Sequence, residues 1–185
     1  MPWMNRRALL AALGLPALLA ACVSYDPAAS YLGGIGSPVR GAALNAPYHF
    51  GDLSKWRGQP GRAALAVAQI EFLADRLTND PYWSSNVSGL VPLQMQQARA
   101  EVRDYLGIHA DAPPELVMAA LRRANEALET GSPAAAEAAL QGPAFSRGGA
   151  GTLRLLADMP RLPRAAAAAG AVNAEMARLD NERNR

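Results

Sequence analysis

The apolar and polar positions of the chain repeat with a helical period from residue 62 onwards. Glu71, Asp75 and Thr78 occupy one face of the first such segment, and its other face is apolar. The apolar face consists of Ala66, Ile70, Leu73 and Leu77. This spacing predicts an amphipathic helix. We expect the helix to end near Asn79, because Pro81 disfavours the helical conformation at the residue before it.

The same period predicts further helices along the rest of the chain. We expect them at residues 91–106, 113–130, 133–141 and 164–182, with a shorter segment at 152–159 compatible with helix. Asp111 is placed to cap the third helix, Ser132 to cap the fourth, and Gly107 to end the second. Residues 79–90 and 143–152 are expected to form loops.

No run of alternating β-branched residues indicates a strand. The chain is therefore predicted to be all-α, a small helical bundle of about four to five helices. The pair of helices from Glu115 to Leu140 resembles one tetratricopeptide-type hairpin. No second copy follows at a fixed period, so a solenoid built from such repeats is not expected.

Residues 23–61 differ in composition from the rest of the chain, because glycine and proline recur throughout them. This pattern predicts a tether without helix or strand. Its aromatic residues are unusual for a linker, so we expect the part from Tyr48 to Trp56 to pack on the helical domain. The alternative is that these aromatic side chains lie at the level of lipid headgroups.

The first 21 residues have the organisation of a signal peptide. Arg6 and Arg7 precede an uncharged, leucine-rich stretch over residues 8–21. That stretch is shorter than the ~20 apolar residues a helix needs to span a bilayer. Its length is typical of the apolar region of an export signal.

The end of this stretch resembles the lipobox of bacterial lipoproteins, in which leucine and two small residues precede a cysteine. The matching residues here are Leu19, Ala20, Ala21 and Cys22. The resemblance implies cleavage before Cys22 and lipid attachment to its sulfur, which would anchor the protein to a membrane. The alternatives are an ordinary secretory signal cut elsewhere and an uncleaved anchor. Val23, where aspartate is absent, resembles the outer-membrane sorting choice of lipoproteins in enteric bacteria, and this resemblance implies an anchor in the outer membrane with the domain in the periplasm.

This pattern divides the chain into a signal peptide (1–21), a lipidated cysteine with its tether (22–61) and an alanine-rich helical domain (62–185). The 18 basic residues include the two arginines of the signal peptide, so the mature chain balances its 16 acidic residues. A near-neutral chain gives no indication of nucleic-acid binding. Cys22 is the only cysteine, which excludes an intramolecular disulfide.

The candidates for chemistry are few. His49 and His109 have no second ligand at metal-binding spacing, so neither a metal nor a cofactor is expected. Ser88 lacks the first glycine of a nucleophile elbow. The glycine-rich run 148–152 lacks the lysine of a phosphate-binding loop. The sequence therefore predicts no catalytic residue.

The leading hypothesis is a non-enzymatic envelope lipoprotein whose helical domain binds or scaffolds another envelope component, most simply a protein. Tyr82 and Trp83, between two predicted helices, form a candidate interaction surface; otherwise they cover the end of the bundle. A second hypothesis is a module that binds a small apolar ligand between its helices. A third is an enzyme, which would need Glu71 or Asp75 buried in a cleft with a shifted pKa.

Overall fold

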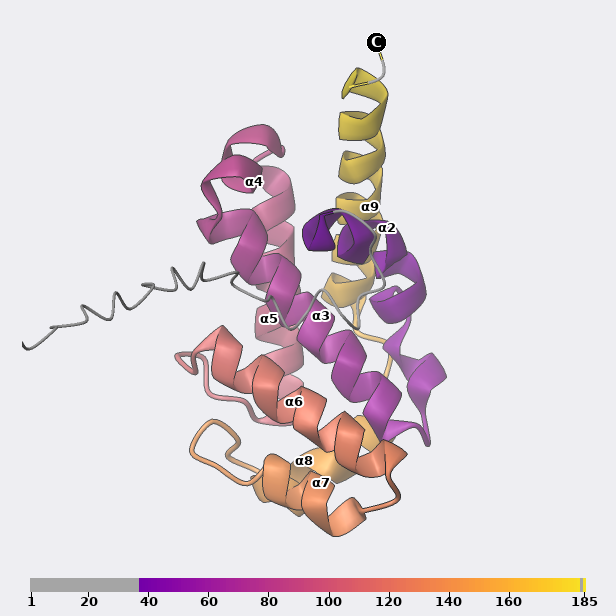
Figure 1. Cartoon of the computed structure of the whole chain (residues 1–185), viewed down its shortest axis with the longest axis vertical. Helices are drawn as coiled ribbons and strands as arrows, with labels where there is room; N and C mark the ends of the chain where they lie inside the picture. The colour runs from indigo at the N-terminus through magenta and orange to yellow at the C-terminus, as the bar shows by residue number, and fades with distance from the viewer. Residues whose placement is uncertain (1–36, 184) are drawn as a thin grey trace, which may run out of the picture.

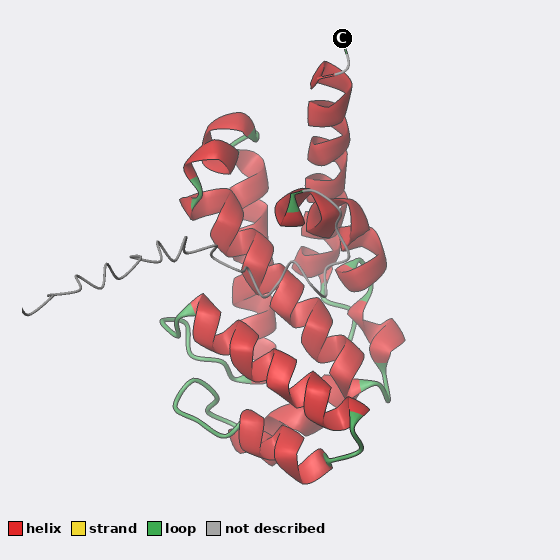
Figure 2. Ribbon diagram, in the orientation of Figure 1, coloured by secondary structure: helices red, strands yellow, loops and turns green. Residues whose placement is uncertain are grey.

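The computed structural model describes residues 37–183 and residue 185. The predicted signal peptide with its recognition residues Leu19, Ala20 and Ala21, and the predicted lipidation site Cys22, lie outside the described residues. The described chain is helical (Figure 2). Its only strand-like pairing is an isolated antiparallel bridge between Ile108 and Phe145. The prediction of an all-α protein is confirmed for this part of the chain.

The described residues form eight α-helices and one 3₁₀-helix, η1, more than the four to five predicted. The elements are α2 (Pro38–Phe50), η1 (Leu53–Trp56), α3 (Pro60–Asn79), α4 (Pro81–Asn86), α5 (Leu90–Leu106), α6 (Pro114–Glu129), α7 (Pro133–Ala139), α8 (Gly148–Ala157) and α9 (Pro163–Arg183). The additional helices arise where the sequence predicted a tether or a loop.

Helix α2 lies inside the glycine- and proline-rich segment for which no helix was predicted, and that prediction is wrong for Pro38–Phe50. Pro38 stands at the first helical position, where a missing N–H has no cost. One face of the helix is buried against α3 and α9. That face consists of Val39, Ala42, Ala43, Ala46 and Phe50. Tertiary packing thus stabilises a helix whose apolar face is mostly alanine.

Packing of the following residues on the domain is confirmed in part. Phe50, Leu53 and Trp56 are buried in the core, whereas Tyr48 is exposed. The indole N–H of Trp56 donates a hydrogen bond of 2.8 Å to the carbonyl of His49. Trp56 is therefore a core residue and not one that lies among lipid headgroups.

Helix α3 is the centre of the molecule (Figure 1). It packs against α2, α4, α5, α6 and α8. All nine residues of 66–74 are buried, so the helix is covered on every face. The sequence predicted that Glu71 lies on the polar face of this helix. That prediction is wrong, because Glu71 is only 1% exposed. An ion pair with α5 compensates this burial and is described below.

Several helix ends also differ from the sequence prediction. Helix α4 occupies the predicted loop because Asp80 accepts hydrogen bonds from the N–H groups of Tyr82 and Trp83. Asp111 does not cap α6, which begins at Pro114 without a side-chain cap. Helix α8 begins at Gly148, inside the predicted glycine-rich loop. The left-handed Gly107 at the end of α5, with φ of 70°, is as predicted.

The contact between α7 and α8 depends on a residue without a side chain. A Cβ atom on Gly149 would lie 1.9 Å from the backbone oxygen of Glu137. The two helices therefore approach more closely than any other residue would allow at this position.

We expect Gly149→Ala to lower the free energy of unfolding by about 1–3 kcal/mol, because the helices must separate to admit the methyl group. The measurement is urea unfolding followed by circular dichroism. Gly89→Ala is the matched control, since nothing lies within 4 Å of its Cβ position, and it should change stability by less than about 0.5 kcal/mol. Equal effects of the two substitutions would contradict the close approach.

Candidate functional site

The two aromatic residues of the predicted interaction surface have different environments. Both lie on α4, with their rings perpendicular and their centroids 5.0 Å apart. Trp83 is 8% exposed and belongs to the hydrophobic core, whereas Tyr82 is 53% exposed. Only Tyr82 therefore remains as a surface side chain, and Trp83 covers the end of the bundle.

Tyr82 is close in sequence to two exposed leucines that sequence reasoning missed. Leu90 and Leu93 are 67% and 53% exposed and lie one turn apart on α5, whose other face buries Val91 and Met95. Of the five large hydrophobic residues exposed in the described chain, three fall within residues 82–93. We call Tyr82, Leu90 and Leu93 the apolar end. The helical period could have revealed the leucines, because they lie off the buried stripe of α5.

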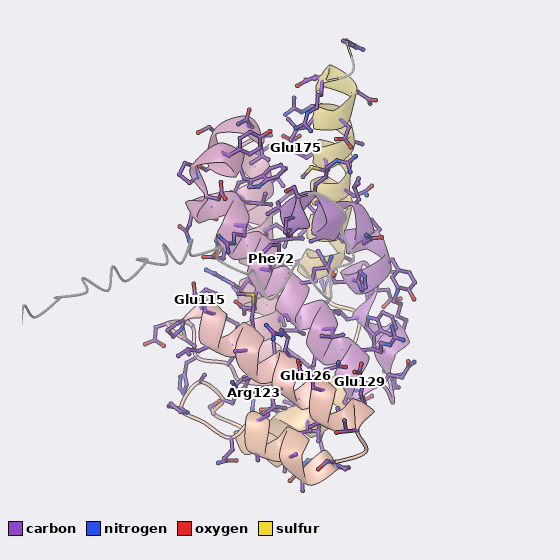
Figure 3. The ribbon with its side chains drawn as sticks, in the orientation of Figure 1. Phe72, Glu115, Arg123, Glu126, Glu129 and Glu175 are labelled. Carbon is purple, nitrogen blue, oxygen red and sulfur yellow. The ribbon has the colours of Figure 1, made fainter. Side chains whose placement is uncertain are left out.

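Helix α9 fixes the turn between α4 and α5. The Glu175 carboxylate accepts a hydrogen bond of 2.6 Å from the backbone N–H of Ser88. Arg178 donates to Glu175 at 2.8 Å and to the carbonyl of Asn86 at 3.3 Å. Figure 3 labels Glu175 on the side of α9 that faces α4. Arg178 and the Ser88 N–H lower the pKa of Glu175 below its usual range, so this contact is an ionised carboxylate holding the turn.

Farther along α9, Arg183 donates a hydrogen bond of 3.1 Å to the hydroxyl of Tyr82. The phenol is thereby held at its polar tip while its ring remains exposed. Most charged side chains of α9 are exposed or half-buried. Glu175 is the exception, because it is 8% exposed.

The first turn of α2 meets the last turn of α9 in the same part of the molecule. Arg40 binds Asp180 through two hydrogen bonds, of 2.9 and 2.5 Å. Asn173 donates to the carbonyl of Leu44 at 2.9 Å. These pairings make α2 antiparallel to α9. The chain that leads back to Cys22 therefore joins the domain beside the C-terminal part of α9.

The buried carboxylate considered for an enzyme has a structural partner. Both oxygens of Glu71 accept hydrogen bonds of 2.7 Å from Arg103 on α5. Arg103 also donates to the carbonyls of His109 and Ala110, at 3.2 and 2.8 Å. Burial raises the pKa of Glu71, and Arg103 opposes this shift. The pair joins α3, α5 and the loop after α5, and leaves neither carboxylate oxygen without a partner.

Four surface hollows of the described chain include charged residues in their linings. One of about 260 Å³ lies beside Arg103 and is lined by Gln96, Arg99, Asp104 and three apolar residues. Three others, at different places on the surface, each include at least one arginine. None of these four is lined by apolar residues alone.

The remaining candidates for a functional site are the two histidines and the glycine-rich run 148–152. Among the described residues, no group of three or more His, Cys, Asp or Glu side chains could hold a metal ion. Burial lowers the pKa of His49. The backbone N–H of Gly149, in the glycine-rich run, donates to Gln141 at 2.9 Å. That donor is therefore already used within the protein.

Lys55 is the only lysine of the chain and lies against two aromatic rings. Its ammonium nitrogen is 3.7 Å from the ring centre of Tyr48 and 4.5 Å from that of Trp56. It also donates a hydrogen bond to the carbonyl of Tyr48. This cluster closes the junction between α2 and η1 through cation–π contacts.

Comparison with known proteins identifies no relative. No protein-family model, no curated protein and no solved structure matches the chain. Within the described residues, no helix is both long and apolar enough to cross a membrane.

We predict that Glu175→Gln lowers the free energy of unfolding at neutral pH by about 1–2 kcal/mol, because a charge-assisted hydrogen bond becomes neutral. The pKa of Glu175 is lowered from 4.5 in the folded protein. Its stabilising contribution is therefore present above pH 4.5 and lost as the pH falls through the lowered value. The difference between wild type and variant should shrink over that range in urea unfolding at a series of pH values.

Glu182→Gln is the matched control, since Glu182 also accepts a hydrogen bond from Arg178 but its side chain is 58% exposed. This exposed pair should contribute less than about 0.5 kcal/mol. A difference for Glu175→Gln that persists unchanged at acidic pH would contradict the role of the ionised carboxylate.

Arg103→Met should lower the free energy of unfolding by about 3–5 kcal/mol, because it leaves the Glu71 carboxylate buried and unpaired. The double variant Glu71→Leu/Arg103→Met should lose less than the sum of the two single losses, since no isolated charge remains. A double-mutant cycle measured by urea unfolding tests this. Additive losses would show that the two side chains contribute independently.

Proposed function

We propose that this protein is a non-enzymatic lipoprotein of the cell envelope. In this proposal Cys22 carries the lipid, the signal peptide is removed, and the helical domain binds or scaffolds another envelope component. The outer membrane, with the domain in the periplasm, is the location that Val23 favours. The apolar end, Tyr82, Leu90 and Leu93, is the surface we assign to that contact.

The observation that carries the proposal is the sequence Leu19-Ala20-Ala21-Cys22 at the end of a short apolar stretch. A lone cysteine in an exported protein asks for an explanation, and lipid attachment supplies one. Two or more acyl chains at one cysteine give a firm anchor, since each buried CH₂ contributes about 0.8 kcal/mol. The apolar end supports contact with another envelope component, because three of the five exposed large hydrophobic residues of the described chain fall within this short stretch.

The carboxylates considered for catalysis have other partners, which favours a binding role over an enzymatic one. Both oxygens of Glu71 are bound by Arg103. Asp75 accepts a hydrogen bond of 2.7 Å from Asn79 on the same helix. A general base needs an oxygen within reach of a substrate proton, and the Glu71 pair offers none.

We expect the mature protein extracted from membranes to have the mass of a chain beginning at Cys22 plus acyl groups. Cys22→Ser should abolish the added mass, because the thioether to lipid cannot form. Intact-mass spectrometry of both proteins is the measurement. A mature wild-type chain with a free thiol, or one beginning at another residue, would overturn the proposal.

A further inference from the structure

We propose that the envelope component in contact with the apolar end is the lipid bilayer itself. Tyr82, Leu90 and Leu93 would lie in the interfacial region of the membrane that holds Cys22. The inference rests on the proposed lipid anchor and names the partner of the surface assigned to it.

The first argument is where the anchor joins the domain. Fifteen residues, 23–37, separate Cys22 from α2, and they can span at most about 50 Å. They join the domain at the first turn of α2, which binds the last turn of α9 through Arg40 and Asp180. Figure 1 shows that end of α9 and helix α4 toward one end of the molecule, with α7 and α8 at the other. The point at which the tether enters the domain therefore lies toward the same end of the molecule as α4.

The second argument is the chemistry of the exposed side chains. Tyrosine has an apolar ring and a polar hydroxyl, and it is enriched at the level of lipid headgroups. The Tyr82 hydroxyl is bound by Arg183, so the ring and not the polar tip is available for contact. Leu90 and Leu93 add apolar area one turn apart on a single helix. Such a surface gains free energy when it enters the headgroup and acyl boundary.

The third argument is the charge around this surface. Arg40 pairs with Asp180, and Arg178 pairs with both Glu175 and Glu182. Together with Arg183, these residues carry three positive and three negative charges, so the end has no strong field of either sign. Contact with lipid should therefore depend on apolar area and need no anionic headgroups, with little effect of salt.

The other exposed apolar residues do not share these features. Leu116 lies on α6. This helix packs against α3 and α7, and it makes few or no contacts with α9. The ring of Tyr48 already makes a cation–π contact with the ammonium group of Lys55. Leu116 therefore provides a matched control, since it is as exposed as the leucines of the apolar end.

The test uses the fact that Cys22 is the only cysteine and is blocked once it carries lipid. Leu90→Cys, Leu93→Cys and, as control, Leu116→Cys each give one reactive thiol for a nitrobenzoxadiazole label. The mature, lipidated variants are reconstituted into protein-free vesicles of phosphatidylethanolamine and phosphatidylglycerol. The emission wavelength of each label, and its quenching by lipids with spin-labelled headgroups, are measured in these vesicles. The reference is the emission of the same labelled proteins in detergent-free buffer after enzymatic removal of the tether.

Labels at positions 90 and 93 should shift their emission to shorter wavelength in vesicles and be quenched by the spin-labelled lipid. The label at position 116 should do neither. The shift should persist in vesicles without phosphatidylglycerol and at high salt. Tyr82→Ser should reduce the shift at position 90, because it removes the aromatic part of the same surface.

Two outcomes would overturn the inference. Labels at 90 and 93 that remain in water, as at 116, would show that the apolar end does not contact lipid. A shift that appears only in native envelope membranes and not in protein-free vesicles would assign the surface to a protein. Intact mass of the same samples separates these failures from failure of the anchor, since an acylated chain without the shift leaves the proposed lipoprotein standing.

Discussion

The structure depends on one constraint, which is that α3 must be covered on all sides. Nine consecutive buried residues make this helix the common contact of most of the others. Four of the nine are small: Ala66, Ala68 and Ala74 with Val67. Small side chains bury little apolar area each, but they allow neighbouring helices to approach closely. The short helices of the molecule are accordingly stabilised by packing and not by their own length.

Complete burial of α3 also explains the Glu71–Arg103 pair. A helix covered on every face has no side left for a charged residue, so the Glu71 carboxylate needs a partner within the protein. Arg103 supplies it and satisfies two loop carbonyls as well. Such a pair contributes little net stability compared with apolar side chains. It does fix the relative positions of α3, α5 and the loop that follows α5.

At the other end of α5, a second set of polar contacts organises the surface to which we assign a function. Glu175 and Arg178 of α9 hold the turn after α4, and Asp180 of α9 holds the start of α2. One helix therefore places the apolar end and the point where the anchor joins the domain in the same part of the molecule. The proposed contact with lipid rests on this arrangement and on the proposed anchor.

The sequence by itself determined the all-α class and the helices at α3, α5, α6 and α9 to within a few residues, and it predicts lipid attachment at Cys22. Each of these depends on local features: helical period, glycine and proline at helix ends, and a short motif. Tertiary structure alone decided that Pro38–Phe50 is helical, that Trp83 is buried while Tyr82 is exposed, and that Glu175 faces Ser88. A helical period shows which face is apolar, but it does not show which neighbour covers that face. Those outcomes depend on contacts between residues far apart in the chain, which no local pattern encodes.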